Sequence, residues 1–424
     1  MSSACASPRA AGTICELNPI HNGHVRLLRA MREEVGADGC LICLMSGRFV
    51  QRGTPAVADP YIRAKAALAG GADLVLELPF PWSASGAEFF ARAGVSILTR
   101  LGVDRIAFGS ECGDPHLLQT AAEALSAPSF AEQCTARVRA GVGAAAALEQ
   151  VLRDALQGQT LPEGFPSSND LLAIQYLRAL SESGSAALPL VIRREGQDYR
   201  DTLLTNASAP SATSLRLLMR EAADDPDTLS AMLEGTMPSE ALTCYLEAVR
   251  GGEAPAREEA LLPFFHAFLR LADPNELSRL TELSGGLAHR LVSTALATPT
   301  PQDFWNRIRS RLYTDARLRR ALLYAAVGVT EDDLRAPPTY TTLLAATPRG
   351  CAFLRAHRAS HRASCRAVKA GGAETIPVVT KPADAPAGRG TDLSRRADAL
   401  FTLCLPRPTE AAAPLRRGAC ILPD

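Results

Sequence analysis

Short apolar runs alternate with amphipathic stretches along the first 110 residues of the chain. The apolar runs have the length of buried β-strands, and the stretches between them repeat apolar residues with the helical period. Expected strands cover 12–17, 40–45, 72–80 and 103–109, and expected helices cover 24–35, 60–71 and 85–102. Strands that alternate with helices in this way are typical of βαβ units, so the pattern predicts a parallel sheet.

Helical patterns dominate the rest of the chain. Residues 115–183 read as helices, 188–195 as one more strand of the sheet, and 211–222 as a helix with Ser and Thr in its first turn. After Pro226 the pattern stays helical to about residue 335. The fold class that this order predicts is α/β, with a parallel sheet first and helices afterwards.

Two domains are expected from this change of pattern. The first, over 1–225, holds the parallel sheet, and the second, over 226–424, is mainly helical. Within the second, 369–390 is rich in Gly, Pro and Ala, which predicts a partly irregular tail in which IPVVT, residues 376–380, could form a short strand. The length of 424 residues and the 47% hydrophobic content allow a sizeable core in each domain.

Charge is balanced over the whole chain but not along it. There are 45 Lys and Arg against 45 Asp and Glu, yet the region from Gln302 to the end carries 20 basic and 11 acidic residues. A basic C-terminal third predicts a surface that binds a polyanion such as RNA. A basic tail without a partner would have the same composition.

The chain reads as a cytoplasmic protein. Its first residues, MSSACASPRAAG, lack the apolar core of a signal peptide, and no uncharged apolar run reaches about 18 residues, so no membrane span is expected. Because thiols stay reduced in the cytoplasm, we expect the eleven cysteines to be free thiols rather than disulfides. Cys40 and Cys43 form a C-x-x-C, but they lie in an expected buried strand and favour core packing over a redox or metal role.

The segment CELNPIHNGH, residues 15–24, holds the candidate phosphate-binding residues of the loop between the first expected strand and the first expected helix. It leaves an expected strand and opens an expected helix, at the edge where parallel sheets bind ligands. Helix-start N–H groups favour phosphate, Gly23 allows close approach of the backbone, and the imidazoles of His21 and His24 can donate hydrogen bonds to phosphate oxygens. A polar loop with two solvated histidines is the alternative.

A second anion site is expected at SATSLR, residues 211–216. Hydroxyl groups in the first turn of a helix, followed by Arg216, suit a phosphate group. Seen alone, the segment reads equally well as an ordinary N-cap with a surface arginine. The combination with H-x-G-H earlier in the chain favours the anion site.

Other candidates are weaker. Glu77 and Glu88 sit where an acid or base could act, but such carboxylates more often cap helices or form ion pairs. Arg52, in the loop after the second strand, could bind acetate or phosphate. The remaining candidates, which share one helix face and read as solvated rather than as metal ligands, are His357, His361 and Cys365. No metal-binding residue is predicted.

Together, these motifs resemble a known family. H-x-G-H with a late S-x-T-x-x-R is similar to the nucleotidylyltransferase superfamily, whose first domain is a Rossmann-like parallel sheet. The fuller set resembles the bacterial tRNA(Met) cytidine acetate ligases: CELNPIHNGH, LMSGRFVQRGTPAVAD, AFGSECGD, SSNDLLAIQYL and ASAPSATSLR. The likeness is dense to residue 220 and thins to fragments later.

This resemblance implies an ATP-dependent ligase. The family makes acetyl-adenylate from ATP and acetate, with Mg²⁺ sharing the charge of the phosphates, and acetylates N4 of the wobble cytidine of elongator tRNA(Met). The tRNA would bind the basic C-terminal domain. Two rivals remain: a small-molecule adenylyltransferase that makes a nucleotide cofactor, and a non-catalytic RNA-binding protein on the same fold.

The resemblance also implies the residues of the site. His21 and His24 would steady the phosphates as catalytic residues, and an arginine of IRRE would bind ATP; alignment on the following DYRD favours Arg194 over Arg193. The implied ATP-binding residues are Cys15, Glu16, Asn18, Pro19, His21, Asn22, Gly23, His24, Gly109, Asn169, Arg194, Ser214 and Arg216.

Four positions depart from the family pattern. Leu17 and Ile20 stand where family members usually have aromatic residues, so a stacking or packing role there becomes aliphatic. Arg48 stands in MSGRF where the family usually has asparagine, and Arg200 stands in YRD where it has histidine. We expect Arg48 and Arg200 at the rim of the site.

Overall fold

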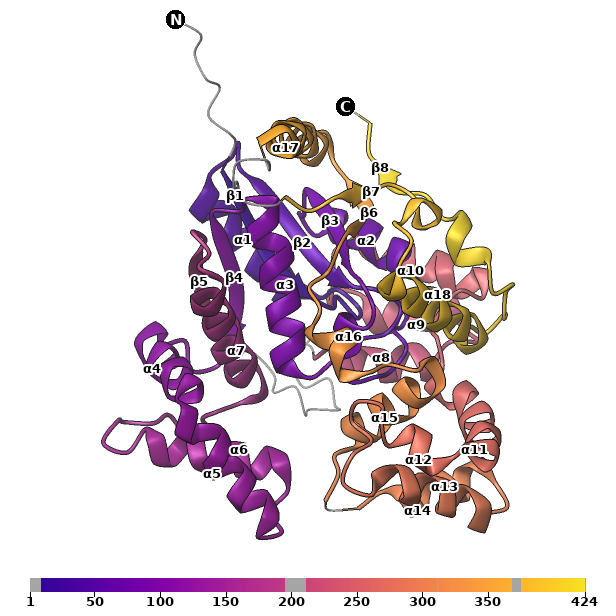
Figure 1. The fold of residues 1–424 in the computed structure, drawn as a ribbon. Helices are drawn as coiled ribbons and strands as arrows, with labels where there is room; N and C mark the ends of the chain where they lie inside the picture. Colours follow the sequence, from indigo (N-terminus) through magenta and orange to yellow (C-terminus); the bar gives the residue numbers. More distant parts are fainter. Residues whose placement is uncertain (1–8, 195–210, 311, 368–374, 424) are drawn as a thin grey trace, which may run out of the picture.

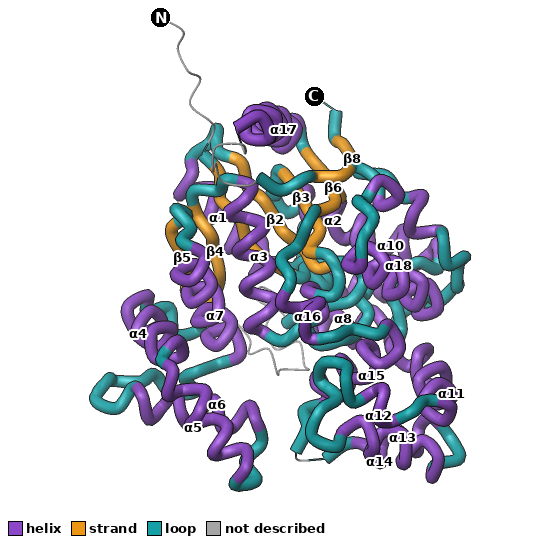
Figure 2. The backbone as a smooth tube through the Cα atoms, in the orientation of Figure 1, coloured by secondary structure: helices purple, strands orange, loops and turns teal. Residues whose placement is uncertain are grey.

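A computed structural model describes residues 9–194, 211–310, 312–367 and 375–423. One sheet of eight strands forms its centre (Figure 2). The strands are β1 Ala10–Cys15, β2 Cys40–Ser46, β3 Leu74–Leu78, β4 Arg105–Ser110, β5 Leu188–Arg193, β6 Thr341–Ala346, β7 Val378–Val379 and β8 Cys420–Ile421. Their order across the sheet is β5-β4-β1-β2-β3-β6-β7, and β8 also pairs with β6.

The first five strands form the predicted parallel sheet. β1 pairs in parallel with β2 and with β4, β2 pairs in parallel with β3, and β4 with β5. Every residue of β1 and β2 is buried, because helices cover both faces. Cys40 and Cys43 are among these buried residues, as core packing requires. The fold class read from the sequence is confirmed.

Three strands from the last hundred residues complete this sheet, and the sequence analysis identified only the region of β7. β6 pairs antiparallel with β3, where Leu76 lies opposite Leu343. β7 and β8 then pair with β6. The region after residue 225 is mainly helical, as expected, but it also supplies one edge of the sheet. The boundary at residue 225 stays a prediction.

Helices cover the sheet in two layers (Figure 1). One face packs against α1 Asn22–Val35 and α2 Pro60–Ala69, and three further helices share the core on this side: α8 Ala212–Glu221, α9 Pro226–Leu233 and α10 Ser239–Gly251. The other face packs against α3 Ala87–Leu101, α7 Ser168–Ser183 and α17 Pro348–Ala367. The apolar residues of each layer form a separate core, so the sheet is enclosed on both sides.

Two groups of helices project beyond the carboxyl ends of the parallel strands (Figure 1). The first group is α4 Pro115–Ser126, α5 Pro128–Arg139 and α6 Ala144–Ala155. The second group is α11 Leu262–Leu271, α12 Pro274–Leu277, α13 Leu287–Ala297, α14 Pro301–Ile308 and α15 Asp315–Val327. The chain then returns to the sheet through α16 Glu331–Arg335 and later adds α18 Arg389–Phe401. None of the described helices is long and apolar enough to cross a membrane.

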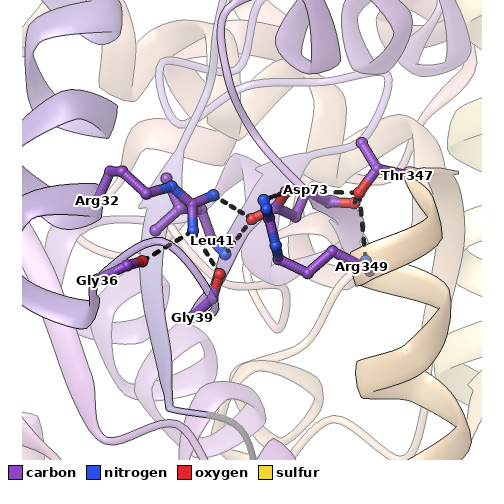
Figure 3. Close-up of polar contacts among 8 residues, drawn as sticks. Arg32, Gly36, Gly39, Leu41, Asp73, Thr347 and Arg349 are labelled. Atoms are coloured by element: carbon purple, nitrogen blue, oxygen red, sulfur yellow. Dashed lines mark hydrogen bonds and ion pairs between the residues drawn. The ribbon is translucent and has the colours of Figure 1, made fainter.

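Asp73 joins the region after β6 to the early strands (Figure 3). It lies at the amino ends of β2 and β3, away from the two projecting helical groups. Its carboxylate accepts a hydrogen bond from the backbone N–H of Leu41 at 2.9 Å and from Arg349 at 2.8 Å, and it also pairs with Arg32. Thr347, directly after β6, donates to the backbone oxygen of Asp73. One buried carboxylate therefore links α1, β2 and the start of α17.

Arg48 is a second link between the two parts of the chain, and its expected place at the rim is wrong. Its side chain is buried and pairs with Asp59 at 2.9 Å and with Asp398 of α18 at 3.0 Å. Two carboxylates offset the cost of burying the guanidinium group. Arg200, the other departure, lies outside the described residues.

Candidate functional site

The loop between β1 and α1 fixes the two histidines. His21 is the N-cap of α1, and its Nδ1 accepts a hydrogen bond from the backbone N–H of Gly23 at 3.0 Å. The backbone N–H of His21 in turn donates to Nδ1 of His24 at 3.2 Å. Because each Nδ1 accepts a hydrogen bond, a neutral ring carries its proton on Nε2. A Cβ at position 23 would lie 2.8 Å from the His21 ring, so this turn requires glycine.

Both imidazoles are held neutral. Their ring centroids lie 3.9 Å apart. Burial lowers the pKa of His21 well below its usual value, and the charges of His24 and Arg194 lower it further. Burial, followed by the charge of Arg194, lowers the pKa of His24 to about 3. The pair is therefore built to donate hydrogen bonds from Nε2 to an anion rather than to transfer protons.

This neutrality is testable by titration. We expect the His24 ring of the free protein to stay neutral from pH 8 down to pH 5, because its folded pKa of about 3 lies below the unfolded value of about 6.5. Bound pyrophosphate adds negative charge and should raise the pKa. Two-bond ¹H–¹⁵N spectra report the ring state directly, and the urea-unfolded protein is the control. A midpoint near 6.5 in the folded, free protein would contradict the assignment.

Two arginines face the histidines from later parts of the chain. Arg216, on α8, donates to the backbone oxygen of Asn18 at 2.7 Å and to the hydroxyl of Thr213 at 3.0 Å. Arg194 follows β5 and pairs with Glu111, with 3.3 Å between Nε and Oε1. A Cβ at Gly109 would lie 2.9 Å from Cγ of Arg194, so glycine leaves space for this side chain. The DYRD segment used to choose Arg194 lies outside the described residues.

These groups line one hollow at the carboxyl ends of β1 and β4. The empty space measures about 1150 Å³ with its open mouth, which is ample for a nucleotide. The implied ATP-binding residues that line it are Cys15, Glu16, Asn18, His21, His24, Gly109, Asn169, Arg194 and Arg216. Segments that are far apart in sequence thus meet at one hollow that histidine and arginine side chains line.

The other four implied residues do not line this hollow. Asn22 points away and donates from its side chain to the backbone oxygen of Gly235 at 2.7 Å. Ser214 is buried, and its backbone N–H donates to the hydroxyl of Ser211, which caps α8. Pro19 and Gly23 belong to the turn that shapes the loop. Roles for these residues in ATP binding stay predictions.

Glu111, on the loop after β4, was not singled out from the sequence. Its carboxylate accepts a hydrogen bond from the side chain of Asn169 at 2.6 Å, contacts the Ser167 hydroxyl and pairs with Arg194. It therefore orients two residues of the hollow. No sequence pattern indicated this, because the four residues come from three separate segments.

Arg63 is the second residue that sequence reasoning missed. Its side chain is fully buried under the loop and donates to the backbone oxygens of Glu16 at 2.6 Å, Ser46 at 2.8 Å and Ala58 at 3.0 Å. These oxygens belong to the loop after β1, to the last residue of β2 and to the entry into α2. The available signal was an arginine on the apolar side of the helix PYIRAKAALA.

The two aliphatic residues that replace the family's aromatic residues pack beneath the loop between β1 and α1. Leu17 and Ile20 are both buried, and the backbone N–H of Ile20 donates to the hydroxyl of Tyr245 at 3.3 Å. Leu17 has a φ of +45°, an uncommon conformation for a residue with a side chain. Such strain persists where surrounding packing holds it, which is frequent at functional sites.

Most of the weaker candidates lie elsewhere. Glu88 pairs with Arg178 at 3.9 Å, and His357 contacts the backbone oxygen of Ile376. Burial and Asp398 raise the pKa of Glu77 to about 7, but Glu77 is not in the hollow. Arg52, by contrast, lines the hollow.

No metal cluster is preformed in the part of the chain that the structure describes: no three His, Cys, Asp or Glu side chains are placed to hold an ion. Among the described residues that line the hollow, Glu16 supplies the carboxylate, and its Oε1 already accepts a hydrogen bond from the backbone N–H of Gln51 at 3.0 Å. A hard cation such as Mg²⁺ prefers oxygen ligands and keeps several waters. It would fit here if phosphate oxygens supplied most of the ligands.

Known proteins resemble this chain over most of its length. The HIGH Nucleotidyl Transferase family model matches residues 9–405. A tRNA(Met) cytidine acetate ligase of Syntrophotalea carbinolica is 37% identical over 84% of this chain and 83% of its own length. One from Acetivibrio thermocellus is 34% identical over 77% of this chain and 79% of its own.

Two solved structures share the fold. Thermotoga maritima TmcAL in its apo form superposes with a TM-score of 0.85 and 26% identity, covering 98% of this chain and 99% of that one. The same protein bound with alpha-thio ATP gives a TM-score of 0.82 with the same coverage. The likeness therefore extends through the C-terminal region where the sequence motifs become sparse.

Proposed function

Because the chain belongs to the tRNA(Met) cytidine acetate ligases of the HIGH nucleotidyl transferase family, we propose that it acetylates N4 of the wobble cytidine of elongator tRNA(Met). ATP and acetate supply the activated acetyl group. The observation that carries this proposal is the neutral pair His21 and His24, which faces Arg194 and Arg216 across a nucleotide-sized hollow.

In the first step, a carboxylate oxygen of acetate attacks the α-phosphate of ATP, and the bond to pyrophosphate breaks. Negative charge grows on the phosphate oxygens as this happens. The Nε2–H groups of His21 and His24 donate to those oxygens, and the guanidinium groups of Arg194 and Arg216 offset the charge. Because the imidazoles are already neutral and oriented, they need no reorganisation during the reaction.

Mg²⁺ would supply further charge neutralisation on the phosphates. Glu16 is the carboxylate of the hollow beside the histidines that could reach a cation or its water shell. The remaining implied contacts, from Asn18, Gly109 and Asn169, would position the nucleoside part. These assignments rest on the lining of the hollow and on the family motif.

In the second step, the N4 amine of the cytidine attacks the acetyl carbonyl. The new C–N bond forms, the bond to AMP breaks, and the amine loses a proton. Acetyl-adenylate is labile in water, so it should stay in the hollow until the tRNA arrives. The two helical groups beyond the strand ends, α4–α6 and α11–α15, offer surface for a large acceptor on either side.

Labelled acetate tests the proposal. We expect label to enter elongator tRNA(Met) only with ATP present, and we expect no label when uridine replaces the wobble cytidine, because uridine lacks the exocyclic amine. Equal labelling of the uridine transcript would overturn the acceptor. AMP joined to a small metabolite would identify a small-molecule adenylyltransferase instead, and tRNA binding without any pyrophosphate release would identify a non-catalytic RNA-binding protein.

A further inference from the structure

A groove lined with arginines leaves the ATP hollow. Its walls carry Arg52, Arg216, Arg220 and Arg319, with Glu258 as the acidic residue of the lining. The groove shares Arg52, Arg216 and Ser168 with the ATP hollow, so one opens into the other. Four guanidinium groups line the groove with Glu258, and Glu259 pairs with Arg220 beside it, so an excess of positive charge favours a polyanion in this groove.

The far end of the groove opens into an apolar pocket. This pocket, the Trp305 pocket, is lined by Trp305, Phe265 and leucines of α11 and α15, and its polar lining residues include Glu259 and Gln302. It shares Pro55, Glu258 and Arg319 with the groove. The guanidinium carbon of Arg319 lies 5.3 Å from the centre of the Trp305 ring. A half-buried aromatic ring with an arginine against its face suits a stacked nucleobase.

The walls of the groove are fixed relative to each other. Arg319 pairs with Glu258 at 2.8 Å, which holds its guanidinium between the groove and the Trp305 pocket. Gly53, next to Arg52, has a φ of +73°, and a Cβ there would lie 2.7 Å from the backbone nitrogen of Arg320. The loop after β2 therefore packs directly on the backbone of α15. The groove is a built feature rather than a chance alignment of surface arginines.

The wobble cytidine of the proposed acceptor lies in the anticodon loop, so the nucleotides beside it are single-stranded, and the cytidine base has to leave its stack to react in the ATP hollow. Their phosphates need a cationic path that begins at the hollow, and their bases need aromatic surface. The groove supplies the first and the Trp305 pocket supplies the second. We propose that the groove and the Trp305 pocket bind the single-stranded RNA next to the acceptor cytidine, with phosphates on the arginines and one flanking base against Trp305.

This inference rests on the proposed function for the identity of the RNA, but its test does not. A fluorescein-labelled oligouridine is titrated into the full-length protein at several salt concentrations. Arg220→Gln should weaken binding severalfold and reduce the salt slope by about 0.7, the value for one lost phosphate contact on a single strand. Trp305→Leu should weaken binding by roughly 5- to 150-fold.

The fluorescence of Trp305 also reports oligouridine binding directly. Trp82 is 5% exposed, whereas Trp305 is only half-buried, so bound oligouridine should quench mainly the Trp305 fluorescence. The matched control is Arg250→Gln on α10: Arg250 pairs loosely with Asp227 at 3.7 Å, as Arg220 does with Glu259 at 3.6 Å, but lies outside the groove. This control should bind like the unmodified protein.

Acetate-dependent exchange of pyrophosphate into ATP is measured in parallel for every variant. Neither Arg220 nor Trp305 lines the ATP hollow, so exchange should stay unchanged and also shows that each variant is folded. Unchanged oligouridine binding in both variants would overturn the inference, and so would a parallel loss of exchange, which would assign the groove to ATP. If the unmodified protein fails to transfer acetyl to tRNA, the proposed function is contradicted, but the oligouridine titration still tests whether the groove binds RNA.

Discussion

His24→Ala should lower kcat for acetate-dependent pyrophosphate release by about a hundredfold or more, because one preorganised donor to a developing oxyanion is worth on the order of 3 kcal/mol. The ring of His24 carries its proton on Nε2, since its Nδ1 accepts the backbone N–H of His21. Alanine removes the donor and also leaves that N–H without its partner. KM for ATP should change less than kcat, because the interaction strengthens mainly in the transition state.

The control for this variant is His116→Ala, which removes an exposed histidine from the start of α4. It should release pyrophosphate at the unmodified rate. Thermal melts of both variants separate loss of chemistry from loss of fold. A His24→Ala protein that melts normally and still forms acetyl-adenylate at close to the unmodified rate would remove His24 from the catalytic residues.

Arg63→Met should destabilise the protein by about 3 to 5 kcal/mol, because the variant leaves several buried backbone oxygens without a donor. The oxygens of Glu16, Ser46 and Ala58 lose the bonds that join the loop after β1, the end of β2 and the entry into α2 to Arg63. Burial lowers the pKa of Arg63, which shows that the charge is costly to bury, so removal of the charge offsets part of the loss. The site loop should loosen as well, which raises KM for ATP in the protein that remains folded.

Lys65→Met is the matched control on the same helix. Lys65 lies largely in solvent and pairs weakly with Glu247 at 3.8 Å, so its replacement should change stability by less than about 1 kcal/mol. The midpoints of urea unfolding compare the two variants. An Arg63→Met midpoint as high as that of Lys65→Met would contradict the role given to Arg63.

Periodicity predicted the first 110 residues well. The expected strands and helices up to residue 110 agree with β1–β4 and α1–α3 within a few residues at each end, because each is a strongly patterned segment with clear turn residues between. β6 was missed for the opposite reason. TTLLAA is a short run after a long helical region, and it becomes a strand only because the edge of β3 is open to it.

Motifs located the site better than its supporting contacts. His21 and His24 follow a strand and begin a helix, and that local context was enough to expect an anion site. Glu111 and Arg63 act through partners that are distant in sequence or through backbone oxygens, neither of which leaves a pattern. The sequence could not predict the arginine groove for the same reason, because Arg52, Arg216 and Arg319 come together only in the folded chain.

The pairing of β3 with β6 has a consequence for how the protein is made. The residues that line the ATP hollow all lie before residue 217. The free edge of β3, however, is covered only when β6 has been made, because Leu76 pairs with Leu343. During synthesis, the nascent chain therefore exposes an apolar edge strand, LVLEL, for as long as the ribosome needs to add the helices in between. Open edge strands invite pairing with other chains, and long-range pairings form slowly. Aggregation of nascent chains, rather than loss of chemistry, should be the first cost of mutations that delay or shorten the C-terminal part.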